Sequence, residues 1–434
     1  MVRTLVRPVT KTIVLPTLHT GQVSAFEART RFSAVRCGRR WGKTVYGETL
    51  SADTAVKGYP VGVFAPDFKI LSETYHEMLE MLEPVVKRAS QQKGVIRLKT
   101  GGRLDFWSLE NERAGRSRKY KLAWIDEGAY TKNNVRGIWE KSIRPTLLDL
   151  AGSALVTSNT NGVNPENFFW AICNDSTLGF TEYHAPTHTN PHLPAEELLK
   201  LQAENHPLVY AQEYLAEFVD WSGVQFFELA KLLGVDGQAV PVPTRCDAVY
   251  AILDTAVKDG REHDGTAVSY WAKINVGLTY KLVCLDWDLV QIEGSLLEGW
   301  LPRVFKRLEE LATETRARFG SLGVWIEDKA SGTILLQQAE RRGWDAKAID
   351  SVLTSVGKDE RAISVSGYIH QDLVKFSVPA YDKTMMYKGS TRNHMVSQVL
   401  GFRVGDKQAH TRADDLLDTF TYAVALALGD SGGI

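Results

Sequence analysis

The sequence has few of the features that mark several common protein classes. Its four cysteines, Cys37, Cys173, Cys246 and Cys284, are scattered without C-x-x-C spacing, which argues against a disulfide framework or a structural zinc site. No apolar stretch approaches the length of a membrane span, and the N-terminal region lacks the continuous apolar core of a secretory signal. We therefore expect a protein of a reducing compartment that has no membrane partner.

Net charge is nearly absent. The chain has 51 lysines and arginines against 52 aspartates and glutamates, a formal charge of −1. A surface that binds nucleic acid would have to be a local basic patch, and the net charge neither supports nor excludes one. No internal repeat or low-complexity tract is present, which argues against a repeat architecture.

The length of the chain favours two domains. Its 434 residues exceed what one hydrophobic core usually serves, and 44% hydrophobic and 24% charged residues are ordinary for a globular protein. The stretch 234–245 is rich in glycine and proline and is typical of a connector. We expect a first domain at 1–225, a linker at 226–245 and a second domain at 246–434.

Strand-like and helix-like segments alternate in the first half. Buried strands are expected at 61–66 and 152–162, a helix at 71–89, and a hairpin at 94–109 around Gly101 and Gly102. Such alternation predicts an α/β fold with a mostly parallel sheet and helices on both faces.

The segment 31–44, RFSAVRCGRRWGKT, has the pattern of a phosphate-binding loop. A buried strand would end here, backbone N–H groups would surround the β- and γ-phosphates, and the next helix would present its positive end to them. Lys43 would then contact the phosphates, and Thr44 would hold Mg²⁺. Because Cys37 replaces the first glycine of G-x-x-x-x-G-K-[ST], with Gly38 one residue later, the segment alone also fits an ordinary strand-to-helix turn.

A second segment, KLAWIDE at 121–127, is an apolar run that ends in two adjacent carboxylates. A buried parallel strand would deliver them beside the phosphate loop, where Asp126 suits Mg²⁺ and Glu127 suits polarisation of the attacking water. Alone, the pair also fits a helix N-terminus with favourable placement in the helix dipole. The order of the two segments, phosphate loop and then acidic strand, favours an ATPase.

The second half carries carboxylates where apolar elements end or begin. Strands are expected at 248–253 and 322–326 and a helix at 411–428, and the acidic positions beside them are Asp254, Asp264, Glu327, Asp328, Asp414, Asp415 and Asp418. Uncompensated carboxylates at such positions cost free energy of folding. They suit instead a pair of hard divalent cations about 4 Å apart, and such a pair activates water and stabilises the leaving 3′-oxygen of a phosphodiester. Each position alone also fits a turn former or a helix N-terminal charge, but together they favour a metal-dependent nuclease.

The joint order of these motifs resembles the large subunit of the tailed-bacteriophage terminase, the DNA-packaging motor, over nearly the whole chain. The carrying segments are Gln22 ahead of CGRRWGKT, WIDE, VTSN, QEYLAEF, ILDTA with DGTA, IEDKASG and ADDLLD. The resemblance implies an α/β protein with an N-terminal P-loop ATPase domain of the additional-strand type. It also implies a C-terminal ribonuclease H-like nuclease domain.

The resemblance assigns roles in the ATPase half. Gln22 matches the adenine-reading glutamine, and Arg39 matches a loop arginine that stabilises transition-state charge in cis. The nucleotide-binding set is Gln22, Gly38, Arg39, Arg40, Trp41, Gly42, Lys43, Thr44 and Asp126. Within it, Trp41 is expected to pack on the core, and Arg40 also fits a solvated cation.

Two further roles in this half follow from the resemblance. Thr157, Ser158 and Asn159 lie where the family has its coupling motif, a polar strand exit that senses the γ-phosphate, although the proline common there is absent. Arg116, with Arg113 as a substitute, is the candidate finger that reaches a neighbouring subunit's ATP. The alternative for that segment is a solvated basic turn.

In the nuclease half, the resemblance makes Asp254, Asp328 and Asp415 the metal ligands. The supporting acids are Asp264, Glu327, Asp414 and Asp418, and the choice between Asp414 and Asp415 as primary ligand is open. Basic residues in the segment 383–392, together with Lys358, Arg361 and Arg403, are expected to contact DNA phosphates.

The implied cofactors are ATP and Mg²⁺, with Mn²⁺ able to substitute in the nuclease. The implied partners are double-stranded DNA, the portal protein and procapsid, and the small terminase subunit, with a homo-oligomeric ring when docked and a monomer in solution. The place of action is the host cell cytoplasm, transiently at the portal and not in the mature virion. Rival interpretations are a helicase-like ATPase, a resolvase-type nuclease acting on DNA outside packaging, and a scaffold whose acids are structural.

Overall fold

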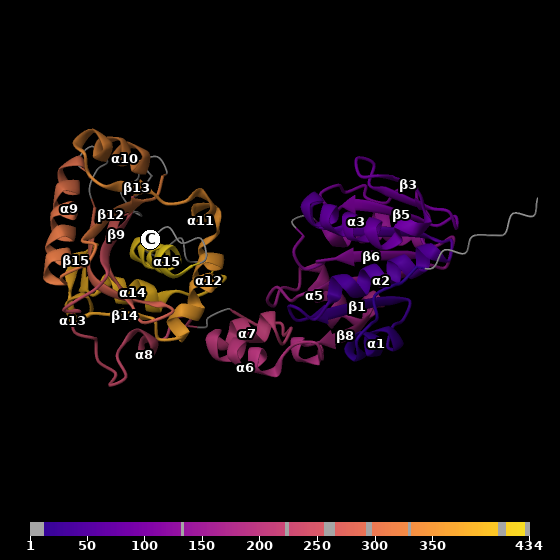
Figure 1. Ribbon diagram of the computed structural model, residues 1–434, viewed down its shortest axis with the longest axis horizontal. Helices are drawn as coiled ribbons and strands as arrows, with labels where there is room; N and C mark the ends of the chain where they lie inside the picture. The colour runs from indigo at the N-terminus through magenta and orange to yellow at the C-terminus, as the bar shows by residue number, and fades with distance from the viewer. Residues whose placement is uncertain are drawn as a thin grey trace, which may run out of the picture. The chain divides into compact units, whose positions relative to one another are not determined.

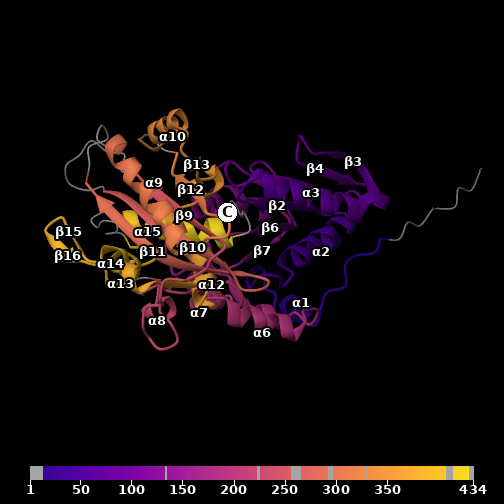
Figure 2. The same ribbon diagram turned by 60° about the vertical axis from the view of Figure 1, so that its left-hand side comes forward.

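The computed structural model describes residues 13–131, 134–221, 225–255, 265–291, 297–328, 331–406 and 414–429. The chain divides into two compact units, Met1–Gln202 with Pro207–Asp220, and Ala203–His206 with Trp221–Ile434. Each unit is a β-sheet covered by helices, as expected for an α/β protein (Figures 1 and 2). In the part of the chain described, no helix is both long and apolar enough to cross a membrane.

The first unit is built on an eight-stranded sheet, counted over the described residues, with the order β3-β4-β5-β2-β6-β7-β1-β8. The strands are β1 (Phe32–Cys37), β2 (Pro60–Ala65), β3 (Val86–Ser90), β4 (Val95–Leu98), β5 (Arg103–Ser108), β6 (Leu122–Asp126), β7 (Ser153–Ser158) and β8 (Thr181–Ala185). The run from β5 to β8 is parallel, while β3 and β4 join it antiparallel. The expected hairpin is confirmed as β4 paired with β5.

Helices cover both faces of this sheet. They are α1 (Thr20–Glu27), α2 (Lys43–Val56), α3 (Phe68–Leu82), α4 (Val135–Ile138), α5 (Phe168–Asn174) and α7 (Pro207–Glu213), with α6 (Ala195–Glu204) crossing into the second unit at Ala203. Short turns of 3-10 or π type lie at η1 (Glu83–Val85), η2 (Trp139–Ile143), η3 (Arg144–Leu147), η4 (Ser176–Leu178) and η5 (Thr187–Thr189). Since strand side chains alternate, Val61 and Val63 pack with α2 and α3, whereas Phe64 packs in the cluster that includes Phe169 of α5.

One expected element of this unit is wrong in its extent. The helix predicted at 71–89 ends at Leu82, and the chain then turns through η1 into strand β3. Pro84 lies in that turn, where its missing N–H cannot continue the helical hydrogen-bond ladder. The residues from Val86 onward pair with β4 instead, so the register of β4 decides their conformation.

The second unit has a six-stranded sheet within the described residues, in the order β13-β12-β9-β10-β11-β14. Its strands are β9 (Ala248–Asp254), β10 (Thr266–Asn275), β11 (Tyr280–Val290), β12 (Ser321–Ile326), β13 (Ala346–Ala348) and β14 (Val374–Phe376), and a separate hairpin is formed by β15 (Met385–Tyr387) and β16 (Ser390–Arg392). β9, β10 and β11 are antiparallel neighbours, whereas β12 runs parallel to β9. The carboxyl ends of β9 and β12 therefore meet at one edge.

Helices again cover both faces of the sheet. They are α8 (Leu229–Leu232), α9 (Leu297–Glu314), α10 (Ser331–Arg342), α11 (Ser351–Ser355), α12 (Lys358–His370), α13 (Val378–Asp382), α14 (His394–Gly401) and α15 (Asp415–Leu428). Along β9, Tyr250 and Ile252 pack in the cluster that contains α15, whereas Val249 and Ala251 pack in the cluster that contains α9. The burial of α15 brings its N-terminal carboxylates to the edge where β9 ends.

The segment expected as a linker, 226–245, packs with the second unit. Phe226, Phe227 and Leu232 are fully buried members of that unit's core, and Val240 forms a bridge to Ser377. Glycine and proline between 234 and 245 shape a surface loop here, but the aromatic residues that precede them bury too much apolar area to remain a free connector.

Candidate active sites

The phosphate loop lies between β1 and α2, as the sequence predicts. Gly42 has a φ of 96° and precedes α2 without a side-chain cap, so the N–H groups of the first helical turn are available to an anion. A Cβ at this position would lie 2.8 Å from Gln22 Nε2, and a Cβ on Gly38 would lie 2.2 Å from Thr187 Oγ1. Glycine is therefore required at both positions. At 42 it allows the positive φ, and at 38 it allows the close approach of Thr187.

Gln22 and Trp41 hold this loop against α1. Gln22 is buried, its Oε1 accepts from the His19 backbone N–H at 3.0 Å, and its Nε2 donates to the Gly42 carbonyl at 2.9 Å. Trp41 is fully buried and donates to Thr189 Oγ1 at 2.8 Å, which confirms that it packs on the core. The structure thus shows Gln22 positioning the loop, while its adenine contact stays a prediction.

Lys43 and Glu127 meet at the carboxyl edge of the sheet. Lys43 Nζ lies 2.8 Å from Glu127 Oε1. Burial disfavours the charged form of Lys43, but the neighbouring Glu127 carboxylate, which also accepts a hydrogen bond, outweighs it and raises the pKa of the lysine. The motif lysine and the acidic strand, more than eighty residues apart in sequence, are therefore in direct contact.

Asp126 links the phosphate loop to the coupling segment. Its carboxylate accepts from Thr157 Oγ1 at 2.7 Å and from Thr44 Oγ1 at 3.4 Å. Burial and the adjacent Glu127 charge raise the pKa of Asp126 to about 6, although the Thr157 hydrogen bond acts in the opposite direction. Thr44 and Asp126 supply oxygen donors side by side, which fits the preference of Mg²⁺.

Ser158 and Asn159 extend the same edge. Ser158 Oγ donates to Glu127 Oε2 at 3.4 Å, and Asn159 Oδ1 is buried without a hydrogen-bond partner among the described residues. Asn159 lines a cavity of about 640 Å³ whose other walls are Arg39, Arg40, Lys43, Pro66, Asp67, Ile70, Glu127, Tyr130, Leu201 and Tyr214. Thr157 and Ser158 thus contact Asp126 and Glu127, and Asn159 lines one cavity together with Glu127.

The segment QEYLAEF at 212–218 contacts the predicted phosphate loop, a role that the sequence did not assign to individual residues. Glu213 forms an ion pair with Arg39, and its carbonyl accepts from the Arg39 N–H at 2.7 Å. Burial acts to lower the pKa of the Arg39 guanidinium, but the neighbouring Glu213 carboxylate outweighs burial and raises that pKa. The only signal that could have placed Glu213 here was its membership of a family motif.

Arg116, the candidate finger, lies on the surface of the first unit. Its Nε donates to Ser142 Oγ at 3.0 Å, and the residue is exposed, as is Arg113. The basic turn thus presents cations outward. Whether either one reaches a neighbouring subunit stays a prediction.

In the second unit, the structure brings four acidic side chains together at the edge formed by β9, β12 and α15. Asp254 ends β9 and hydrogen-bonds the Glu327 carboxyl, and the charges of Asp418 and Asp415 also act on it. Burial together with these charges holds the pKa of Asp254 well above its usual range. Tyr422 donates to Glu327 Oε1 at 3.1 Å, which fixes the glutamate toward the cluster.

Asp328, predicted as a ligand, is placed differently from Glu327. It is exposed, and it accepts from Thr333 Oγ1 at 2.6 Å. Successive residues at the end of a strand point to opposite sides, so only one of the two acids can face Asp254. The structure selects Glu327 for that place. Asp264, predicted as a supporting acid, lies outside the described residues.

Two cations of α12 balance the carboxylates of α15. Lys358 forms ion pairs with Asp414 and with Asp418, the latter at 2.8 Å, and the buried Arg361 also pairs with Asp418. Burial raises the pKa of Asp418, and both cations oppose that shift. Asp414 is thus engaged by Lys358. The Asp415 carboxylate accepts from the Gly265 backbone N–H at 3.4 Å, and its charge helps to raise the pKa of Asp254.

The donor set of this cluster consists of carboxylate oxygens, which suits a hard divalent cation. No group of three or more histidine, cysteine or acidic side chains in the described part of the chain has the geometry to hold a metal ion. A hydrogen bond between the Asp254 and Glu327 carboxyls requires a proton between them. A cation bound between the two carboxyls would replace that proton.

Comparison with known proteins identifies the fold. No family model matches the chain, and no curated protein does. The large terminase of a thermophilic bacteriophage matches with 12% identity over 94% of this chain and 99% of that one, at a TM-score of 0.59. The same phage terminase in complex with ATP-γ-S matches with 13% identity over 94% and 98% of the two chains, at a TM-score of 0.56. The chain therefore has the two-unit α/β fold of a phage large terminase, as its motifs predict.

Proposed function

We propose that this chain is a subunit of a viral DNA-packaging motor, which hydrolyses ATP to move double-stranded DNA into a procapsid and cleaves concatemeric DNA with its second unit. The observation that carries the proposal is the convergence, within one terminase-like fold, of Lys43, Thr44, Asp126 and Glu127 at one sheet edge and of Asp254, Glu327 and Asp415 at another. The thermophilic-phage terminase that shares the fold forms complexes with ATP-γ-S and with ADP.

In the ATPase unit, the triphosphate binds over the N–H groups that begin α2. Lys43 transfers its ion pair from Glu127 to the phosphates, which frees the Glu127 carboxylate to orient a water molecule. Arg39, held by Glu213, lines the same cavity as Lys43, from which its guanidinium would stabilise the developing charge. Mg²⁺, held by Thr44 and Asp126, would neutralise phosphate charge.

Hydrolysis is sensed by the strand exit at 157–159. Thr157 bonds Asp126, and Ser158 bonds Glu127, so loss of the γ-phosphate changes the partners of both hydroxyls. The Thr160 hydroxyl, next along, donates to the Gln212 and Glu217 carbonyls, at 3.0 and 2.8 Å. A shift of this strand exit therefore moves the 212–218 segment, which is the physical route by which hydrolysis displaces a DNA-gripping element.

In the nuclease unit, Asp254, Glu327 and Asp415 are the proposed ligands of two Mg²⁺ or Mn²⁺ ions, with Asp418, Asp414 and the more distant Asp328 as supporting acids. Bound by these carboxylates, such ions would supply activation of a water molecule and stabilisation of the leaving 3′-oxygen. Lys358 and Arg361 hold the α15 carboxylates in place by ion pairing. The implied partners are the portal, the procapsid and the small terminase subunit, with a ring of subunits in which Arg116 reaches the next subunit's ATP.

The test uses two point variants of the full chain. Lys43→Ala should abolish ATP hydrolysis and packaging into procapsids but leave plasmid nicking in Mn²⁺, whereas Asp254→Asn should abolish nicking but leave ATP hydrolysis. The exposed Lys57→Ala, at the end of α2, is the matched control for the lysine. Normal hydrolysis by Lys43→Ala would refute the ATPase assignment, and ATP hydrolysis with DNA unwinding but no packaging would favour the helicase-like alternative.

A further inference from the structure

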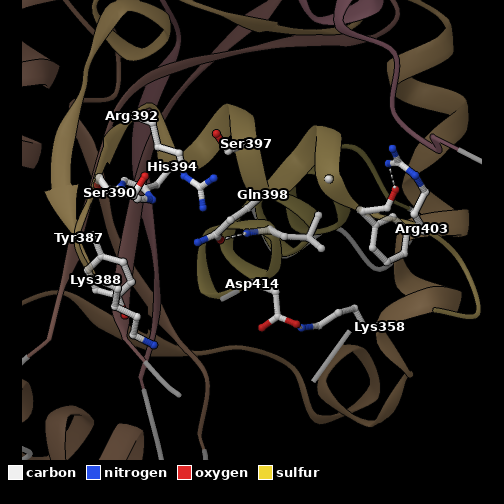
Figure 3. Close-up of a pocket in the computed structure, with 13 residues that line it drawn as sticks. Lys358, Tyr387, Lys388, Ser390, Arg392, His394, Ser397, Gln398, Arg403 and Asp414 are labelled. Atoms are coloured by element: carbon white, nitrogen blue, oxygen red, sulfur yellow. Dashed lines mark hydrogen bonds and ion pairs between the residues drawn. The ribbon is translucent and has the colours of Figure 1, made fainter. Parts of the chain in front are cut away.

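A pocket next to the acidic cluster lies between α14 and the hairpin of β15 and β16. Its volume is about 450 Å³. The residues that line it are Lys358, Tyr387, Lys388, Ser390, Arg392, His394, Ser397, Gln398, Gly401, Phe402, Arg403, Asp414 and Leu417, and we call it the hairpin pocket (Figure 3). Lys358 and Asp414 belong both to this pocket and to the ion-pair network of the acidic cluster, so the two sites are contiguous.

The lining is strongly cationic. Lys358, Lys388, Arg392 and Arg403 line it together with a single carboxylate, Asp414. Lys358 pairs with Asp414 and Asp418, and Arg403 donates to the Leu400 and Phe402 carbonyls. Arg392 is exposed and has no ion-pair partner among the described residues, so its charge is available to a ligand. By contrast, Lys383 and Arg361, which the sequence grouped with these cations, are paired with Asp286 and Asp418. The structure thus gathers only part of the predicted basic set, and gathers it around a cavity.

Gln398 supplies an unsatisfied donor in the same wall. Its Oε1 accepts from the Leu416 and Leu417 N–H groups, at 2.7 and 3.3 Å, and thereby caps the start of α15. This contact fixes the amide, so that Nε2 must point away from the helix. Gln398 is 9% exposed, and Nε2 has no hydrogen-bond partner in the part of the chain described. Figure 3 shows this amide turned toward the side of the pocket where Arg392 and Lys388 lie.

The size and chemistry of the pocket select its ligand. Cavities of this order accept a small molecule or one nucleotide and are too small for a duplex. Cations bind a phosphate, and the amide N–H groups match acceptor atoms of a base edge. A lone inorganic anion would use the cations but not the amide.

We propose that the hairpin pocket takes one unpaired nucleotide of the DNA strand beside the cleavage site, with its phosphate on Arg392 and its base against Gln398. This inference rests on the proposed nuclease function and deepens it. It means that the strands separate locally where the chain cuts, because a paired nucleotide cannot reach the pocket. The hairpin of β15 and β16 then acts as the wall that holds the displaced nucleotide.

The test measures binding of the full chain, in EDTA, to a blunt duplex and to the same duplex with a short single-stranded tail. The wild type should prefer the tailed DNA by about tenfold, since one hydrogen bond to a charged group is worth about that much. Arg392→Ala and Gln398→Glu should each reduce this preference by at least about fivefold. The second variant keeps the acceptor that caps α15 but loses the N–H donors.

Controls separate the proposal from simpler explanations. Arg341→Ala, an exposed arginine of α10 outside the pocket lining, should leave the preference unchanged. If Arg392→Ala weakened the binding of blunt and tailed DNA equally, the proposal would be overturned in favour of a duplex contact. If a free mononucleotide competed as strongly as the tail, it would be overturned in favour of a free-nucleotide site. Because EDTA removes cleavage from the measurement, failure of nicking in Mn²⁺ would contradict the nuclease proposal alone.

Discussion

Lys43 and Glu127 form an ion pair across 2.8 Å, which joins the phosphate loop to the end of the acidic strand. Each holds the other at the edge of the sheet where the triphosphate would lie. A phosphate bound to Lys43 competes with Glu127 for the ammonium group, so nucleotide binding and release of the glutamate carboxylate are one event. With the proposed function, this ion pair would couple occupancy of the site to the availability of its base.

The first prediction concerns that glutamate. Glu127→Gln keeps the size of the side chain but cannot accept a proton, so kcat for ATP hydrolysis should fall by about 10²–10⁴. The dissociation constant for ATP should stay equal or decrease, because Lys43 loses a competing carboxylate. Steady-state hydrolysis and equilibrium nucleotide binding check both parts, with the exposed Glu140→Gln as control. An unchanged kcat would remove Glu127 from the mechanism.

The second prediction separates two neighbouring acids. Glu327 hydrogen-bonds Asp254, whereas Asp328 is exposed beside Thr333. Glu327→Gln should therefore reduce metal-dependent nicking by at least about a hundredfold, and Asp328→Asn by much less. Plasmid nicking at several Mn²⁺ concentrations measures the difference. If Asp328→Asn proved the more damaging, the ligand set inferred from the sequence would stand and the one drawn from the structure would be wrong.

The third prediction concerns a buried carboxyl in α2. Glu48 is 3% exposed and bonds Glu77, and burial, with that neighbour, raises its pKa from 4.5 to about 9. Between these values the folded chain holds a proton that the unfolded chain has released, so stability falls as the pH rises through that window. Glu48→Gln does not titrate, and its melting temperature should exceed that of the wild type by a margin that grows from about pH 5 to about pH 9.

Thermal scans across that pH range check this expectation. Glu80→Gln, on the exposed side of α3, is the control and should follow the wild type. Parallel profiles for Glu48→Gln and the wild type would show that Glu48 does not hold a proton in the folded chain.

The fourth prediction concerns the charge balance of α15. Arg361 is buried, pairs with Asp418, donates to Thr421 Oγ1 at 3.0 Å and lies 3.9 Å from the centre of the Tyr422 ring. Arg361→Ala leaves the buried Asp418 carboxylate with Lys358 but without its guanidinium partner, and should lower the free energy of unfolding by about 3 kcal/mol, the lower end for a broken buried pair. Urea unfolding measures it, and the double variant Arg361→Met with Asp418→Asn should recover most of the loss. A loss no larger than that of the exposed Arg341→Ala would contradict it.

Much of the fold could be predicted from local pattern. The apolar runs at 31–37, 121–126 and 248–254 became buried strands because each is a continuous hydrophobic stretch that only the interior of a parallel or doubly covered sheet can accept. The hairpin at 94–109 followed from its glycines. The helix at 71–89 was overextended, because spacing does not weigh Pro84 against the partner strand that captures Val86.

The candidate sites divide in the same way. The sequence by itself determined which chemistry is present, since Gly-Lys-Thr, Asp-Glu and the later carboxylates are chemical groups that no folding can alter. Only the tertiary structure decided that Glu327 rather than Asp328 faces Asp254, that Gln22 holds Gly42, and that α12 supplies cations to Asp418. The physical reason is that the direction of a side chain at a strand end, and the partner of a buried charge, depend on the register of strands and helices far away in the chain.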